Sequence, residues 1–137
     1  MADTVEFELV TPEELLFSEP VELVVVPGTE GDFGVLSGHS PLISTLRTGV
    51  IAVYENDAVN RRIFVSGGFA EVTPERCTVL ADEAVALDSA NRRDVEERVK
   101  VDRETLESAA DEDKANVAAV LAVSESLLLA LDTAGQA

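Results

Sequence analysis

The sequence predicts an α+β protein, mainly β, with an N-terminal antiparallel β-sandwich followed by a C-terminal α-helical hairpin. All five prolines and all aromatic residues lie at or before Pro74. From about Asp88 onward the chain is rich in Ala, Leu, Val, Glu and Arg and contains only one glycine. Turn formers thus separate short segments in the first part, and helix formers fill the second. We therefore expect a β-sandwich domain at residues 1–87 and a helical hairpin domain at residues 88–137.

The first domain alternates as half-buried strands do. Val5, Phe7 and Leu9 share one face of the segment from Thr4 to Val10, and polar side chains share the other. Further strands are predicted at 21–26, 33–36, 42–46, 50–55, 61–66, 68–72 and 76–81. Short strands with no long helix between them favour an antiparallel sandwich or barrel over a parallel α/β sheet.

The second domain has helical periodicity in two stretches. Asp88 is expected to cap a first helix, which carries a thin apolar stripe that includes Val95, Val99 and Leu106. The acids at 111–113 indicate a break before a second helix that runs to about Asp132. The apolar face of that helix comprises Val117, Val120, Leu121, Ser124, Leu127, Leu128 and Leu131. Two helices joined by a short polar break predict an antiparallel hairpin.

Charge and hydropathy exclude several functions. The net charge is −17, from 27 acids and 10 bases, which disfavours nucleic-acid and anionic-lipid partners. The apolar stretch 115–131 contains polar residues and is shorter than the ~20 residues that a bilayer needs, so no membrane insertion is expected. The N-terminus has no basic stretch followed by an apolar run, so no secretory signal is expected.

Reactive side chains are scarce. The chain has one Cys, one His and no cluster of His and Cys that would suit zinc. Cys77 lies in a predicted strand, which favours a packed thiol over a nucleophile. We therefore expect no catalytic residue, no metal site and no cofactor.

The stretch from Pro27 to Leu42 is rich in glycine but does not match a phosphate-binding loop. It lacks the Gly-Lys-Ser/Thr ending and the Gly-x-Gly-x-x-Gly order, it carries Glu30 and Asp32, and no helix follows it. Its sequence, Val26-Pro-Gly-Thr-Glu-Gly-Asp-Phe-Gly-Val-Leu36 followed by Gly38-His-Ser-Pro-Leu42, resembles the epsilon subunit of the bacterial F-type ATP synthase, which is equivalent to the mitochondrial delta subunit. Thr11-Pro-Glu13, Val65-Ser-Gly-Gly-Phe-Ala-Glu-Val72 and Val79-Leu-Ala-Asp82 match in the same order.

The resemblance implies a non-enzymatic subunit of the rotating central stalk, between the gamma subunit and the ring of c subunits, with transient contact to alpha and beta. It implies that Glu30, Asp32 and His39 contact the c ring and that Thr11 and Leu42 lie near gamma. Other interpretations stay open: Glu30 and Asp32 as solvated turn acids, His39 as a turn residue, and Thr11 and Leu42 as core. The implied location is the cytoplasmic face of the bacterial inner membrane, as a peripheral protein.

The resemblance also raises two regulatory roles. Some relatives bind ATP through a motif in the hairpin, onto which Leu87, Asp88 and Arg98 match; Asn91 and Arg92 depart from it, although Arg92 or Arg93 would partly substitute. The alternative is that Asp88 caps the helix and Arg98 forms a surface ion pair. Inhibitory relatives present basic residues on the second helix, whereas 115–137 contains no Lys or Arg. We therefore expect weak or absent inhibition.

A different class of function also fits the first domain. A free-standing β-sandwich module that binds a protein or a carbohydrate would show the same strand pattern, and a complex with gamma would distinguish the two.

Overall fold

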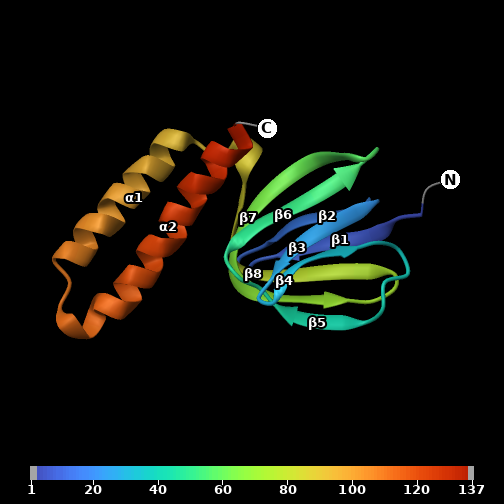
Figure 1. The fold of residues 1–137 in the computed structure, drawn as a ribbon, viewed down its shortest axis with the longest axis horizontal. Helices are drawn as coiled ribbons and strands as arrows, with labels where there is room; N and C mark the ends of the chain where they lie inside the picture. Colours follow the sequence, from blue (N-terminus) through green and yellow to red (C-terminus); the bar gives the residue numbers. More distant parts are fainter. Residues whose placement is uncertain (1–2, 136–137) are drawn as a thin grey trace. The chain divides into compact units, whose positions relative to one another are not determined.

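The computed structural model describes residues 3–135, and the chain divides into two compact units, Met1–Asp88 and Ser89–Ala137. Each unit is described by itself. The described part of the first unit is a β-sandwich-like sheet (Figure 1). Its strands are β1 (Val5–Val10), β2 (Leu15–Val21), β3 (Leu23–Gly28), β4 (Gly31–Val35), β5 (Leu42–Thr45), β6 (Gly49–Glu55), β7 (Ala58–Val72) and β8 (Arg76–Ala86).

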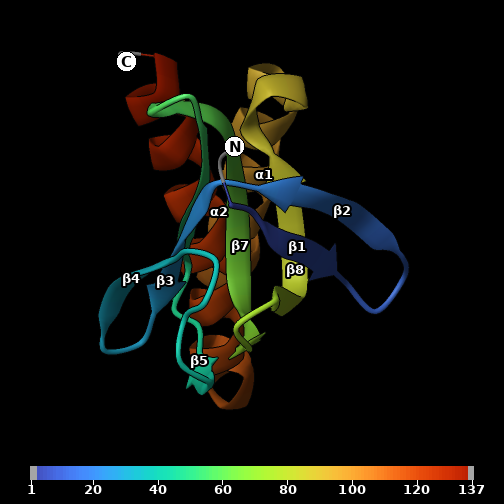
Figure 2. The same cartoon turned by 90° about the vertical axis from the view of Figure 1, so that its right-hand side faces the viewer.

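The strand order is β2-β1-β8-β7-β6-β3-β4, and β5 pairs with β7. Figure 2 shows β7 and β8 side by side, with β1 and β2 on one side of them and β3 and β4 on the other. The named strand pairs are antiparallel, except that β1 runs parallel to β8. The mainly β fold class is therefore confirmed, and the parallel pair is a feature that local sequence patterns do not predict.

Residues 58–72 form one long strand, so the prediction of two strands at 61–66 and 68–72 was wrong. Gly67 and Gly68, which looked like a break, have φ of 67° and 105° inside β7. Before them β7 pairs with β6, and after them with β5. The glycine pair lets one strand change its neighbour without ending, because glycine adopts positive φ at little cost.

Strand β2 was missed, and the strand predicted at 21–26 is shifted to Leu23–Gly28. In β2 only Phe17 and Val21 are buried, so its sequence lacks the alternation that marks a strand. Pro20 also lacks a backbone N–H, which restricts proline to positions such as an edge strand. β2 is such an edge, because it pairs with β1 alone in the strand order.

The core of the first unit lies between the two layers of strands. Val5, Phe7 and Leu9 are at most 1% exposed, which confirms the predicted inward face of β1. The rings of Phe7 and Phe17 pack with centroids 5.3 Å apart. Cys77 is fully buried in the same cluster, as the packed-thiol interpretation expected.

The second unit is a pair of helices, α1 (Arg92–Glu107) and α2 (Lys114–Gly135), joined through a 3-10 turn at Asp111–Asp113 (Figure 1). The cap of α1 is Asn91, whose side-chain oxygen accepts a hydrogen bond from the Asp94 N–H at 3.2 Å. Asp88 was predicted to be this cap. It lies instead in a separate 3-10 turn, Leu87–Ser89, because the helix begins only after Asn91.

The helices bury complementary apolar stripes. Val95 and Val99 of α1 are buried, as are Leu121, Ser124 and Leu127 of α2. Val120, placed on the apolar face by the sequence, is 51% exposed.

Two arginines of α1 pair with the two acids that lie in α2. Arg103 bonds Glu125 at 2.9 Å, and Arg92 bonds Asp132. By length and composition alone, the helix at residues 111–133 could cross a membrane, and it is longer than the 115–131 stretch on which the expectation of no membrane insertion rested. Helices of soluble proteins also pass this test. The ion pairs from Arg92 and Arg103 of α1 to the acids of α2 favour packing of this helix in the hairpin.

Candidate functional site

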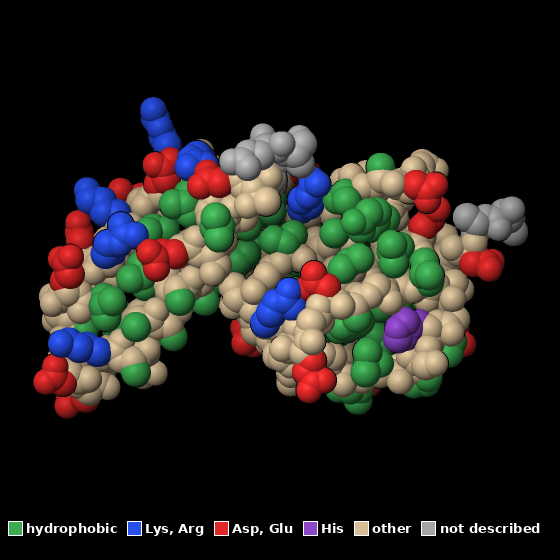
Figure 3. Space-filling view, in the orientation of Figure 1, with side chains coloured by type: hydrophobic (Ala, Val, Ile, Leu, Met, Phe, Trp, Pro, Cys, Tyr) green, Lys and Arg blue, Asp and Glu red, His purple; other side chains and the backbone are tan. Residues whose placement is uncertain are grey.

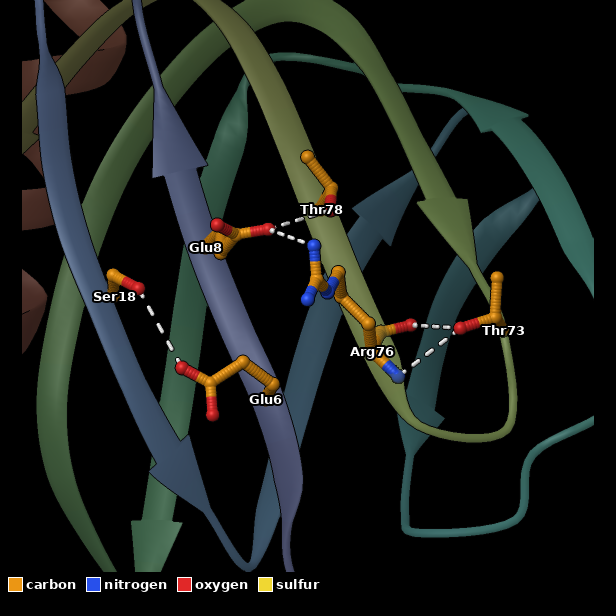
Figure 4. Close-up of polar contacts among 6 residues, drawn as sticks. All are labelled: Glu6, Glu8, Ser18, Thr73, Arg76 and Thr78. Atoms are coloured by element: carbon orange, nitrogen blue, oxygen red, sulfur yellow. Dashed lines mark hydrogen bonds and ion pairs between the residues drawn. The ribbon is translucent and has the colours of Figure 1, made fainter.

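One outward face of the first unit changes from polar to apolar along its strands. On β1 the outward residues are Glu6, Glu8 and Val10, which pair with Arg76, Thr78 and Leu80 of β8. At the polar end, the Glu8 carboxylate accepts from Arg76 at 3.2 Å and from the Thr78 hydroxyl at 3.3 Å (Figure 4). The Ser18 hydroxyl of β2 donates to Glu6 at 3.5 Å. These charges are therefore largely satisfied within the sheet.

The other end of this face is an apolar groove of about 390 Å³. Its lining is Val10, Thr11, Pro12, Gly68, Phe69, Leu80, Ala81 and Asp82. Phe69 and Leu80 are paired across β7 and β8 and are 43% and 39% exposed. Figure 3 shows that hydrophobic side chains also gather over parts of the visible face of the first unit. Exposed apolar area of this kind suits contact with a protein surface.

Thr11, predicted near gamma, lines this groove but is only 8% exposed. Its N–H donates to the Glu14 carbonyl at 2.9 Å, and the Glu14 N–H donates back to the Thr11 carbonyl at 3.2 Å. Thr11 therefore shapes the turn between β1 and β2 and offers little surface of its own.

The turn between β3 and β4 borders a second hollow, which we call the turn cavity. It measures about 580 Å³ and is lined by Thr29, Glu30, Gly31, Asp32, Phe33, Leu42, Ile43, Ser44 and Thr45. Glu30 and Asp32, predicted for the c ring, thus share one cavity with Leu42, predicted for gamma. Leu42 is 37% exposed and Ile43 is 70% exposed. The cavity combines carboxylates with apolar walls.

Arg47 ties this turn to the chain that follows β5. Its guanidinium donates to the Gly28 carbonyl at 2.6 Å and forms an ion pair with Asp32. Its N–H donates to the Pro27 carbonyl at 3.0 Å. Sequence reasoning did not single out Arg47, although it is one of only four cations in residues 1–88.

His39 lies apart from the acidic turn. Asp32 is the second residue of β4 and His39 follows the end of that strand by four residues, so the rest of β4, about 10 Å of extended chain, lies between them. The neighbouring Gly38 N–H donates to the Pro74 carbonyl at 2.8 Å, next to the turn between β7 and β8. The His39 ring is exposed and its Nδ1 lies 2.6 Å from the Ser40 carbonyl oxygen. The structure therefore does not bring His39 together with Glu30 and Asp32.

The residues of the ATP motif fall in different parts of the chain. Asp88 ends the first unit, whereas Arg92 and Arg98 lie in α1. The Arg92 guanidinium is engaged by Asp132 and, at 3.1 Å, by Glu96. The hydrogen bond that Arg92 donates to Asp132 is the main cause that raises the pKa of Arg92 above its ordinary value. Glu96 of α1 and Asp132 of α2 thus already pair with Arg92, the cation expected to substitute in the motif.

No chemistry-bearing cluster was found in the described part of the chain. Within residues 3–135 there is no group of three or more His, Cys, Asp or Glu side chains that would hold a metal ion. Burial raises the pKa of Cys77 to about 12, which keeps the thiol protonated and unreactive.

Comparison with known proteins identifies the family. Residues 4–87 match the β-sandwich domain of the ATP synthase delta/epsilon chain. The ATP synthase epsilon chain of Rhodospirillum rubrum is 57% identical over 131 residues, which cover 95% of this chain and 98% of the relative. The chain belongs to the ATP synthase epsilon family. The epsilon chain of Paramagnetospirillum magneticum is 46% identical over 96% of this chain and 99% of its own length.

A solved structure of the family agrees in fold. A chain of the Euglena gracilis mitochondrial ATP synthase, in a cryo-EM structure of the OSCP/F1/c-ring assembly, superposes with a TM-score of 0.75. It is 27% identical, and the match covers 93% of this chain and 81% of that one. As an epsilon chain, the protein is a subunit that is not itself catalytic. The apolar groove and the turn cavity are accordingly candidate surfaces for contact with other subunits.

Proposed function

We propose that this chain is an epsilon subunit in the central stalk of a proton-translocating F-type ATP synthase, where it links gamma to the c ring and couples proton flow to ATP synthesis. The observation that carries the proposal is similarity over nearly the whole chain to ATP synthase epsilon chains. Its site is the cytoplasmic face of the bacterial inner membrane, where it is peripheral. Contacts with alpha and beta are transient.

The apolar groove is the surface proposed for gamma. Phe69 and Leu80 supply exposed apolar area at its centre, and Thr11 shapes its edge. Leu42, also predicted near gamma, lines the turn cavity instead of this groove, so we propose it for the surface described next. Aromatic and aliphatic anchors in the centre of an interface contribute most of its binding free energy.

Co-purification with gamma tests this assignment. We expect the full chain to bind gamma. Phe69→Ser and Leu80→Ser should each weaken binding by at least about tenfold, because each removes an apolar side chain that the interface with gamma would bury. Leu129→Ser is the matched control, since Leu129 is 65% exposed on α2 and should leave the affinity unchanged. If the full chain forms no complex with gamma, the free-standing binding module becomes the better hypothesis.

The turn cavity is the surface proposed for the c ring. Its carboxylates suit the arginines that the polar loops of c subunits commonly carry, through charge-assisted hydrogen bonds. Of the three residues predicted for this contact, Glu30 and Asp32 line the cavity, and His39 lies at the other end of β4. We therefore propose the turn that carries Glu30 and Asp32 for this contact and leave His39 as a turn residue.

We propose that the hairpin does not act as an ATP sensor. Arg92 already has two carboxylate partners, and Asn91 caps α1 rather than facing a ligand. Calorimetric titration of the full chain with magnesium-free ATP should give no heat at millimolar nucleotide. A saturable heat that disappears in Arg98→Ala would contradict this.

A further inference from the structure

The turn between β3 and β4 is held by residues 45–47, which are the last residue of β5 and the two that follow it. Gly28 pairs with Gly31 across a turn whose central residues are Thr29 and Glu30. The Thr29 N–H donates to the Thr45 carbonyl at 3.0 Å, and the two hydroxyls lie 2.8 Å apart. Gly28 and Leu46 form an isolated antiparallel bridge. Residues 45–47 therefore pair with the turn much as a third strand would, and the turn is not a free hairpin tip.

The Arg47 side chain completes this support by bridging the two strands. One end of its guanidinium binds the Gly28 carbonyl, at the end of β3, and the other end binds the Asp32 carboxylate in β4. The planar fork of arginine suits two acceptors at a fixed spacing, which a lysine ammonium does not reproduce. Arg47 thereby balances the charge of Asp32 and fixes the path of the turn.

Glu30 differs from Asp32 in having no such partner. It lies exposed at the tip of the turn, and no hydrogen bond or ion pair to it occurs among residues 3–135. Leu42 and Ile43 lie across the turn cavity from the acidic turn and expose apolar surface to it. A lysine or arginine can place its aliphatic stem along such apolar walls while its cationic end reaches a carboxylate.

We propose that Arg47 is a positioning residue that neutralises Asp32 and fixes the turn, so that Glu30 is the carboxylate presented to a cationic side chain of the c ring. This inference rests on the proposed central-stalk function. It deepens that function by separating two acids that the sequence treats alike.

The test uses epsilon-depleted ATP synthase in vesicles, to which the full chain is added back. The readout is the concentration of added chain that restores half of proton-driven ATP synthesis. Glu30→Gln should raise this concentration by about tenfold, since a charge-assisted contact is lost. The double variant Asp32→Asn with Arg47→Gln keeps a neutral hydrogen-bonded pair, and it should stay within about twofold of the native chain.

Single substitutions at Asp32 and at Arg47 test whether the ion pair between them positions the turn. Asp32→Asn alone leaves the Arg47 charge unbalanced beside Glu30, so it should weaken restoration more than the double variant does. Arg47→Ala should weaken it as well, and Arg47→Lys should recover only part of the loss. Thermal unfolding of each variant, followed by circular dichroism, shows whether the fold is kept, as the exposed positions of these side chains predict.

Two results would overturn the inference while leaving the proposed function intact. The first is a Glu30→Gln variant as effective as the native chain. The second is a double variant as weak as Asp32→Asn alone, which would make Asp32 itself the contact. If the native chain restores no ATP synthesis, the proposed function itself fails.

Discussion

Gly68 illustrates how one backbone position shapes the apolar groove. It has a φ of 105°, and a β-carbon placed there would lie 1.9 Å from the Leu80 carbonyl oxygen. β7 and β8 can approach this closely only because residue 68 has no side chain. The groove that Phe69 and Leu80 line therefore depends on a residue that contributes no contact area of its own.

We expect Gly68→Ala to destabilise the full chain by at least about 3 kcal/mol, because both the positive φ and the overlap with β8 are unfavourable. Gly38→Ala is the matched control. Gly38 has a φ of 83° but open space around its position, so its cost should be only about 1 kcal/mol of backbone strain. Urea unfolding measures both. Equal losses would show that the contact with Leu80 is unimportant.

The buried thiol of Cys77 makes the stability of the first unit fall at alkaline pH. Burial raises its pKa from 9.0 to about 12, so the folded state holds its proton more tightly than the unfolded state does. Its contribution is fully present below pH 9 and is lost as pH rises from 9 toward 12. We expect the free energy of unfolding to fall by up to about 1.4 kcal/mol per pH unit in that range.

The control for this pH dependence is Cys77→Ala, because other groups also titrate at alkaline pH. Denaturant unfolding of both proteins across pH 8–11 gives the difference in slope, about one proton at most. A native chain whose pH dependence equals that of the variant would show that the thiol titrates normally.

At the scale of elements, the apolar packing of the hairpin includes one buried acidic side chain, Asp102. Asp102 follows Val95 and Val99 at helical spacing on the packed stripe of α1, and its Oδ2 atom is buried without a hydrogen-bond partner. The cross-helix pairs of Arg92 and Arg103 lie exposed, where ion pairs contribute little. Packing rather than charge therefore holds the hairpin, and Asp102 weakens it.

We expect Asp102→Leu to stabilise the helical hairpin by about 1–3 kcal/mol, since it removes an unsatisfied buried oxygen and adds apolar contact. Glu97→Leu, at an exposed position of the same helix, should change stability by less than about 0.5 kcal/mol. Thermal melting followed through the helical circular dichroism signal compares the two. Destabilisation by Asp102→Leu would mean that the carboxylate has a partner in solution.

The elements also show where sequence patterns succeed and fail. The inward face of β1 follows from strict alternation, and the break at Asp111–Asp113 follows from acids ahead of a helix. β2 escaped prediction because an edge strand needs only a few buried residues, and Asn91 replaced Asp88 as cap because both residue types favour that position. Whether a segment becomes an edge strand, or which residue caps a helix, is decided by its contacts with other segments rather than by its local sequence preference.

At the scale of the whole molecule, charge separates the two units. Residues 1–88 contain 16 acids and 4 bases, whereas residues 89–137 contain 11 and 6. The first unit has its own core, since every member of the buried cluster lies at or before Ala81. The second unit carries no cation after Lys114, which opposes docking to acidic segments of other subunits.

We expect truncation after Asp88 to change the ATPase rate of the assembled synthase by less than about twofold, because the acidic tail lacks the basic residues needed for inhibitory docking. The rate is measured with the synthase reconstituted with either the full or the truncated chain. A large gain in hydrolysis on truncation would contradict this and would identify the hairpin as an inhibitor.

The sequence by itself determined the family, the two-part architecture and the acids of the glycine-rich turn, because ordered motifs, alternation and helical period are local properties. Only the tertiary structure decided that Asp32 is paired while Glu30 is not, because Arg47 reaches the turn from 15 residues away. It also separated His39 from these acids along β4, and it brought Phe69 and Leu80 together from different strands. Pairing between distant segments sets such contacts, and no local pattern encodes it.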